Sequence, residues 1–245
     1  MSSPSSMPSW GSLRRARIAR RATLHIMPLA PVALVVGAAL IGVVLGWWPL
    51  AAWADRNIRR DAAGRMPLRA LRASSAGTTA LLFGALAWRF GLDPVLPALL
   101  ALAAAGVALS IVDLTEKRLP NAMVFPTLLV VAVLLVVGAV LTGEWVRLAW
   151  AAAGSAGMFL FYFVLALVSP KAMGMGDVKF ALPLGLALGW FGWLMWVAGL
   201  MGAFLVGGVV AIVALAMRRV TLKGSVPFGP SMVAGAMLAV VAFGA

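Results

Sequence analysis

The sequence contains no cysteine and a single histidine, His25, among its 245 residues. Without cysteine the chain cannot form disulfide bonds, thiolate metal sites or a cysteine nucleophile. One histidine is too few for a histidine-based metal centre. Charged residues are also scarce, at 11%, whereas they make up about 25% of an average soluble domain. A soluble fold of this size would therefore lack the polar side chains needed to cover its surface.

Apolar residues dominate instead, at 63% of the chain. They occur in runs of roughly 20 residues, which is the length that a helix needs to cross the hydrocarbon core of a bilayer. The sequence therefore predicts an all-α, polytopic membrane protein with about eight transmembrane helices. The predicted spans are residues 29–53, 76–90, 95–112, 122–142 and 148–168, two spans within 180–217 that meet at 189–193, and 231–245.

The Lys and Arg residues predict the orientation of the chain in the membrane. Thirteen of them fall in four alternate connections, at residues 55–75, 113–121, 169–179 and 218–230, whereas the connections on the other side hold two. Because cytoplasmic loops carry an excess of basic residues, we expect these four connections to face the cytoplasm. The net charge of +13 therefore reflects membrane orientation, and we expect no nucleic-acid partner.

The chain divides into three regions. Residues 1–28 are rich in Ser, Pro and Arg, and we expect a disordered basic tail. Residues 29–75 hold the first transmembrane helix and a basic cytoplasmic loop, and residues 76–245 hold the main helical bundle. The predicted orientation places the arginines of the tail outside the cytoplasm. Either the tail is translocated, or it belongs to a signal peptide cleaved near residues 52–54, or translation starts at Met27, which is the interpretation that we favour.

Two of the seven acidic residues lie at predicted membrane boundaries. Asp113 ends the third span and Asp177 opens the sixth, so both should lie at the cytoplasmic edge. An ionisable group at such a boundary is costly and marks a candidate functional site. Two nearby carboxylates in a low-dielectric site share one proton, so one can take a proton from a water that attacks a peptide carbonyl while the other donates one. Gly174 and Gly176 would let an extended substrate strand approach the backbone closely.

These acidic residues also have purely structural interpretations. Asp113 could end its helix and pair with Lys117 or Arg118 in a solvated cluster. Asp177 could cap the start of the sixth helix, where Asp is favoured. We expect Glu116 to be a solvated charge in the loop.

Three segments of the sequence resemble those of the type IV prepilin peptidases, which are membrane aspartyl proteases with a Gly-x-Gly-Asp motif. They occur in the order found in that family and on one predicted face of the membrane, and the likeness covers residues 76–245. The segments are Ile111-Val112-Asp113 with Leu119-Pro120-Asn121 and Pro126, then Gly174-Met175-Gly176-Asp177-Val178-Lys179 with Gly185 and Gly189, and finally Val226-Pro227-Phe228-Gly229-Pro230 with Gly235.

The resemblance implies an endopeptidase whose catalytic pair is Asp113 and Asp177, with no metal and no cofactor. Its substrates would be prepilin or pseudopilin precursors, cut where their short basic leader meets an apolar helix at the cytoplasmic face of the inner membrane. Its partners would be these precursors, membrane lipid and pilus or secretion machinery. The residues implied in substrate binding are Gly174, Gly176, Lys179, Pro227, Phe228 and Gly229.

The chain departs from many members of this family between its first two spans. Those members carry a larger insert with paired cysteines, which is linked to N-methylation of the trimmed pilin. Here the loop 55–75 is short, rich in Arg and free of cysteine, so we expect a short form without N-methyltransferase activity. Two alternatives stay open, namely a small transporter that uses the aspartates to carry a cation or protons, and an inactive assembly factor of the same fold.

Overall fold

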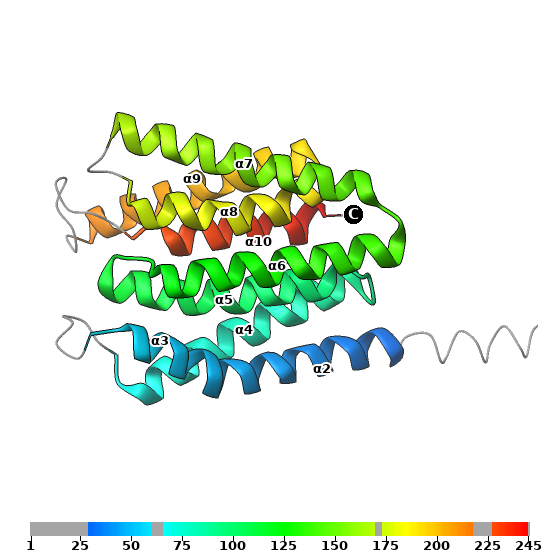
Figure 1. Ribbon diagram of the computed structural model, residues 1–245. Helices are drawn as coiled ribbons and strands as arrows, with labels where there is room; N and C mark the ends of the chain where they lie inside the picture. Colours follow the sequence, from blue (N-terminus) through cyan, green and yellow to red (C-terminus); the bar gives the residue numbers. More distant parts are fainter. Residues whose placement is uncertain (1–28, 60–65, 170–172, 218–226, 245) are drawn as a thin grey trace, which may run out of the picture.

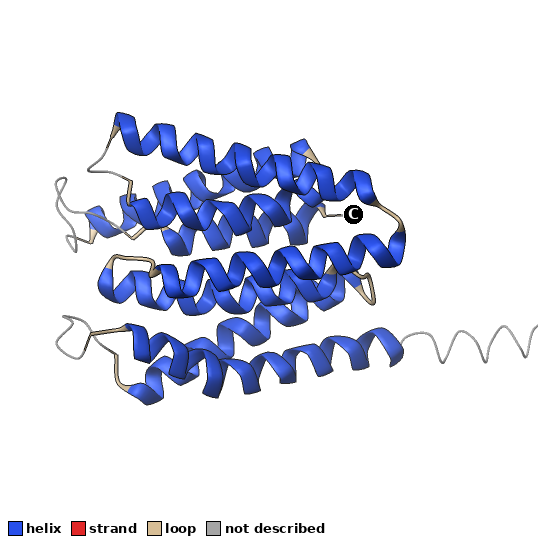
Figure 2. Ribbon diagram, in the orientation of Figure 1, coloured by secondary structure: helices blue, strands red, loops and turns tan. Residues whose placement is uncertain are grey.

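The computed structural model describes residues 29–59, 66–169, 173–217 and 227–244. Every regular element in these ranges is a helix (Figure 2). Five helices are long and apolar enough to cross a bilayer, beginning at Val32, Leu96, Asn121, Trp145 and Trp193. The prediction of an all-α, polytopic membrane protein is therefore confirmed. The predicted tail, residues 1–28, lies outside the described residues.

The first helical rod consists of three segments that follow one another without a break (Figure 1). A π turn joins them at Pro49, whose ring and missing N–H are incompatible with a regular α-helix. This rod packs closely on the next helix, because a Cβ on Gly46 would lie 2.5 Å from the Cα of Ala76. The elements of this hairpin are α2 (Leu29–Leu45), η1 (Gly46–Leu50), α3 (Ala51–Asn57) and α4 (Leu68–Phe90).

The basic connection after the first rod is shorter than the sequence predicts. Helix α4 begins at Leu68, so the second half of the predicted loop is helical. Leu71 and Ser75 are buried in these added turns, whereas Arg69 is exposed. Buried contacts on one face extend the helix beyond its apolar run, while arginine side chains can reach water from the other.

The remaining helices form the main bundle, with α5 at its centre (Figure 1). Two thirds of the apolar window of α5 is buried, compared with 17–33% for the other candidate spans. Helix α5 contacts α4, α6, α8 and α10. The helices are α5 (Leu96–Glu116), α6 (Asn121–Thr142), α7 (Trp145–Val168), α8 (Met175–Trp190), α9 (Trp193–Ala216) and α10 (Gly229–Phe243).

Small residues hold these helices at close range. At the contact between α8 and α7, a Cβ on Gly189 would lie 2.5 Å from the carbonyl oxygen of Trp150. At the contact between α10 and α9, a Cβ on Gly235 would lie 2.1 Å from the backbone nitrogen of Ala203. Such contacts are typical of membrane helices, which associate mainly through tight packing. They fix α8 and α10, the two helices that begin beside α5.

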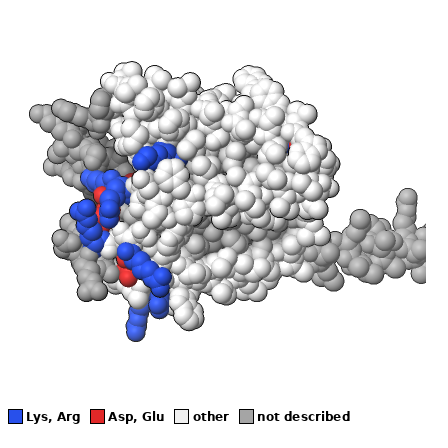
Figure 3. All heavy atoms as spheres, viewed as in Figure 1, with Lys and Arg blue, Asp and Glu red and all other residues white. Residues whose placement is uncertain are grey.

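The charged side chains gather at one end of the molecule (Figure 3). This end holds the C-terminus of α5 and the N-terminus of α8, and therefore both Asp113 and Asp177. The opposite end carries Arg89 and Arg147. The asymmetry agrees with an orientation in which the basic end faces the cytoplasm.

Candidate active site

Asp113 lies in the last turn of α5, which continues to Glu116 beyond the span predicted from the sequence. Its side chain is buried, with 4% of the residue exposed. The backbone N–H of Gly229 donates a hydrogen bond of 2.9 Å to Oδ2 of Asp113. The structure therefore does not show Asp113 in a solvated cluster.

The partner of Asp113 follows from the way α10 begins. Gly229 is the first residue of that helix, and the first N–H groups of a helix have no acceptor within it. A Cβ on Gly229 would lie 2.9 Å from Oδ2 of Asp113, so the close approach requires glycine. Pro230 comes next, in the first turn, where a missing N–H costs nothing. The segment Phe228-Gly229-Pro230 thus directs one free N–H at the carboxylate.

Asp177 lies in the first turn of α8, where Gly174 holds the N-cap position. Oδ2 of Asp177 faces Gly174, at 3.1 Å from where a Cβ would be. Oδ1 is buried and has no hydrogen-bond partner among the described residues. The carboxylate is close enough to Asp113 for their charges to interact. Two acidic residues that are far apart in the sequence therefore meet at the basic end of the bundle.

The predicted Gly-x-Gly-Asp segment packs against the connection between α5 and α6. A Cβ on Gly176 would lie 3.0 Å from Cβ of Leu119 and 3.1 Å from its backbone nitrogen. Nζ of Lys179 donates a hydrogen bond of 3.1 Å to Oδ1 of Asn121. Gly176 and Lys179 therefore join two of the segments that carry the family resemblance. The side of Gly176 that faces Leu119 is not open to a substrate strand.

An aromatic cluster borders Asp177, and its central residue was not predicted from the sequence. The ring of Tyr162 from α7 is 1% exposed and stacks on Phe204 at a centroid distance of 6.0 Å. Phe228 lies 6.2 Å from Tyr162 and 5.4 Å from Phe204. Tyr162 is also close enough to Asp177 for an electrostatic interaction. The only signal in the sequence is that Tyr162 is the single tyrosine of the chain, within an apolar span.

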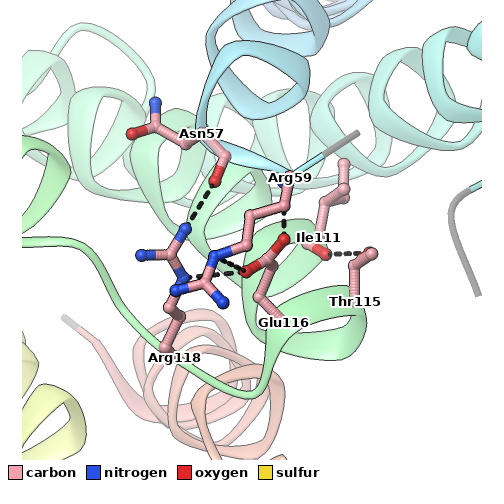
Figure 4. A network of polar contacts seen from close by, with 6 residues as sticks. All are labelled: Asn57, Arg59, Ile111, Thr115, Glu116 and Arg118. Atoms are coloured by element: carbon pink, nitrogen blue, oxygen red, sulfur yellow. Dashed lines mark hydrogen bonds and ion pairs between the residues drawn. The ribbon is translucent and has the colours of Figure 1, made fainter. Parts of the chain in front are cut away.

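The prediction that Glu116 is a solvated charge is wrong. Its side chain is 5% exposed and binds Arg118 and Arg59 (Figure 4). The reason is that α5 continues to Glu116 and carries this carboxylate against the segment that follows α3.

A cavity of about 400 Å³ lies between α4, α5 and α10, and neither Asp113 nor Asp177 lines it. Its lining is mostly apolar and includes Ile111, Leu114 and Pro230, while Ser74 and Ser110 add hydroxyl groups.

The chemistry available at this site is that of two carboxylates and backbone N–H groups. One carboxylate is oriented by Gly229, and the other has a buried oxygen with no hydrogen-bond partner in the part of the chain that the structure describes. Within the described residues, no cluster of three Asp, Glu or His side chains is placed to bind a metal ion. The arrangement can activate a water and donate a proton.

Residues 100–213 match the type IV leader peptidase family. This segment therefore resembles a type IV leader peptidase domain. The matched segment includes both Asp113 and Asp177, and the resemblance recognised in the sequence is confirmed. The domain and the apolar helices together indicate a multi-pass protein of the inner membrane.

Three curated relatives are similar to this chain, and each is named prepilin leader peptidase/N-methyltransferase. The protein of Pseudomonas putida is 31% identical over 169 residues, which are 66% of this chain and 55% of the relative. The protein of Stutzerimonas stutzeri is 31% identical over 152 residues, which are 61% and 51% of the two chains. The protein of Pseudomonas aeruginosa is 29% identical over 164 residues, which are 66% and 55%. The chain thus spans about half the length of these relatives, and no solved structure matches it significantly.

Proposed function

We propose that the protein is an aspartic endopeptidase that removes the short basic leader from type IV prepilin or pseudopilin precursors. The observation that carries this proposal is the pair of carboxylates, Asp113 and Asp177, brought together by α5 and α8 inside a type IV leader peptidase domain. The relatives' names support the leader-peptidase activity.

In the proposed mechanism the two aspartates share one proton and divide the work of hydrolysis. The ionised carboxylate takes a proton from water while the water oxygen bonds to the peptide carbonyl carbon. The protonated carboxylic acid donates its proton toward the amide nitrogen, which leaves as the amine when the C–N bond breaks. In this proposal Gly229 holds Asp113 in place, and Oδ1 of Asp177, which has no hydrogen-bond partner within the described ranges, would contact the reacting groups.

The proposed cleavage takes place at the cytoplasmic face of the membrane. Figure 3 shows the basic end of the bundle, where α5 ends with Asp113 and α8 begins with Asp177. The basic leader of a precursor would stay on that side while its apolar helix enters the bilayer. Gly174, Gly176, Lys179, Pro227, Phe228 and Gly229 are proposed to position the substrate. For Gly176 and Phe228 this action is indirect, because their contacts are to Leu119 and to the aromatic cluster.

We also propose that the protein does not methylate its product. Helix α3 ends at Asn57 and helix α4 begins at Leu68. The connection between them contains no cysteine. Purified protein incubated with a prepilin and a labelled methyl donor should release unlabelled mature pilin, and label on the pilin would disprove this part of the proposal.

Co-expression with a candidate prepilin tests the peptidase proposal. The variants Asp113→Asn and Asp177→Asn keep the shape of the side chain but cannot exchange protons, so each should slow leader removal at least about 100-fold. Asp93→Asn is the matched control, since Asp93 accepts a hydrogen bond from Val95 in a turn at the opposite end of the bundle. Normal processing by either active-site variant would exclude the two-aspartate mechanism, and cation flux without cleavage would favour a transporter.

A further inference from the structure

The helix that bears Asp113 ends in a group of polar contacts, which we call the Glu116 clamp (Figure 4). The carboxylate of Glu116 accepts hydrogen bonds from the backbone N–H of Arg59 and from Nε of Arg118, the latter at 2.9 Å. Nε of Arg59 also lies 3.6 Å from the same carboxylate. Nη2 of Arg118 donates a hydrogen bond of 3.3 Å to the carbonyl oxygen of Asn57. The clamp therefore ties the end of α5 to the chain that follows α3.

Two residues of the clamp, Glu116 and Arg118, flank Lys117, which closes the last turn of α5. The backbone N–H of Lys117 donates a hydrogen bond of 2.8 Å to the carbonyl oxygen of Asp113. Lys117 has a φ of +51° and is the only non-glycine residue with a positive φ in the described ranges. A side chain makes this left-handed conformation unfavourable, so surrounding contacts must hold it. Glu116 and Arg118, on either side of Lys117, supply such contacts.

The clamp also joins a part of the chain that matches the family to a part that lies before the match. Asp113 and Glu116 lie within residues 100–213, which match the leader peptidase domain, whereas Asn57 and Arg59 lie before it. The hairpin of α2, α3 and α4 thus reaches the catalytic helix through Glu116. The buried carboxylate is the shared acceptor of the network, because it binds groups from both parts.

We propose that Glu116 is a positioning residue for Asp113. With Arg118 and the segment after α3, it fixes the last turn of α5 so that the Asp113 carboxylate stays against the N–H of Gly229 and turned toward Asp177. This inference rests on the proposed function, since it assigns Glu116 a part in the same reaction.

The test measures turnover and local structure in the full-length protein in detergent, with a prepilin as substrate. Glu116→Gln should lower kcat about 10-fold, because small displacements of a reacting group carry large kinetic costs, and it should leave KM unchanged. Arg118→Gln, which removes a donor from the other side of the clamp, should have the same effect. Glu116→Asp should recover part of the lost kcat.

Hydrogen exchange at the amide of Gly229 gives a second measurement that does not depend on activity. This amide is bound to Asp113, so its exchange should become faster in both clamp variants if Asp113 has moved. Glu144→Gln is the matched control, because it removes a 3.1 Å ion pair with Arg147 at the opposite end of the bundle. It should change neither kcat nor the exchange at Gly229.

The proposal is overturned if the clamp variants lower only the melting temperature while kcat and the exchange at Gly229 stay normal. It is also overturned if Gly229 keeps its protection in a variant that has lost activity. Failure of the proposed function would look different, because Asp113→Asn would then cleave the precursor normally or the wild-type protein would not cleave it. In that case the exchange at Gly229 would still decide whether Glu116 positions Asp113.

Discussion

The backbone N–H of Gly229 donates a hydrogen bond to Oδ2 of Asp113, and it thereby joins two residues that are 116 positions apart in the chain. The contact links the start of α10 to the end of α5, so the position of one carboxylate depends on how the last helix is packed.

Replacing Gly229 should disturb catalysis through Asp113. In Gly229→Ala the new Cβ would lie 2.9 Å from Oδ2 of Asp113, so the carboxylate or the helix must shift. We expect kcat for leader removal to fall about 10-fold to 100-fold, as for a misplaced reacting group. Gly208→Ala is the control, because nothing lies within 4 Å of the added Cβ. Equal activity of the two variants would contradict the assigned role of the contact.

Replacing Gly176 should weaken the junction between α8 and the connection after α5. The Cβ of an alanine at this position would meet Cβ, the backbone nitrogen and the carbonyl oxygen of Leu119 at 3.0–3.3 Å. Because backbone atoms cannot easily give way, we expect Gly176→Ala to destabilise the protein by about 1–3 kcal/mol. Thermal unfolding in detergent measures this, with Gly77→Ala as the control at an open position. An unchanged melting temperature would show that the junction is loose.

Removing the hydroxyl of Tyr162 should affect activity more than stability. Tyr162→Phe keeps the ring that stacks on Phe204 but removes the hydroxyl group that interacts electrostatically with Asp177. We expect kcat to fall about 10-fold while the melting temperature changes little, since a positioned donor assists proton transfer. Phe163→Leu is the control, because it alters a different aromatic pair on the same helix. If both variants process a prepilin at the normal rate, the hydroxyl has no part in the reaction.

Enlarging Gly235 should separate α9 from α10. An added Cβ would lie 2.1 Å from the backbone nitrogen of Ala203 and 2.5 Å from the carbonyl carbon of Gly202, and neither atom can move without its helix. We expect Gly235→Ala to lower stability by about 2 kcal/mol and to reduce activity, because α10 carries the partner of Asp113. Its melting temperature and cleavage rate should both fall below those of Gly208→Ala. A fall in activity alone would point to a local effect.

The sequence is most informative about features that follow from the order of residues along the chain. Apolar runs predicted the helices, and the distribution of Lys and Arg predicted that Asp113 and Asp177 lie at the same end. The early start of α4 was missed, because burial of Leu71 and Ser75 extends a helix into a polar region that no local pattern marks.

The contacts around the acid pair could not be predicted in the same way. The donor to Asp113 is a backbone N–H, which every non-proline residue possesses, so only the fold selects Gly229. The local sequence predicts a loop charge at Glu116, because Arg59, one of its two partners, lies 57 positions away. Tyr162 belongs to no sequence motif. Its position near Asp177 follows from the packing of α7 against α8 and α9.

Two helices begin at the acid pair: the first N–H of α10 points toward Asp113, and Asp177 lies in the first turn of α8. The aligned peptide dipoles of a helix give its N-terminus a partial positive charge. The negative charge of the acid pair therefore meets a favourable potential that comes from the backbone itself. Unlike the charge of a lysine, this potential cannot be removed by loss of a proton, so an alkaline shift at the membrane surface would leave it in place.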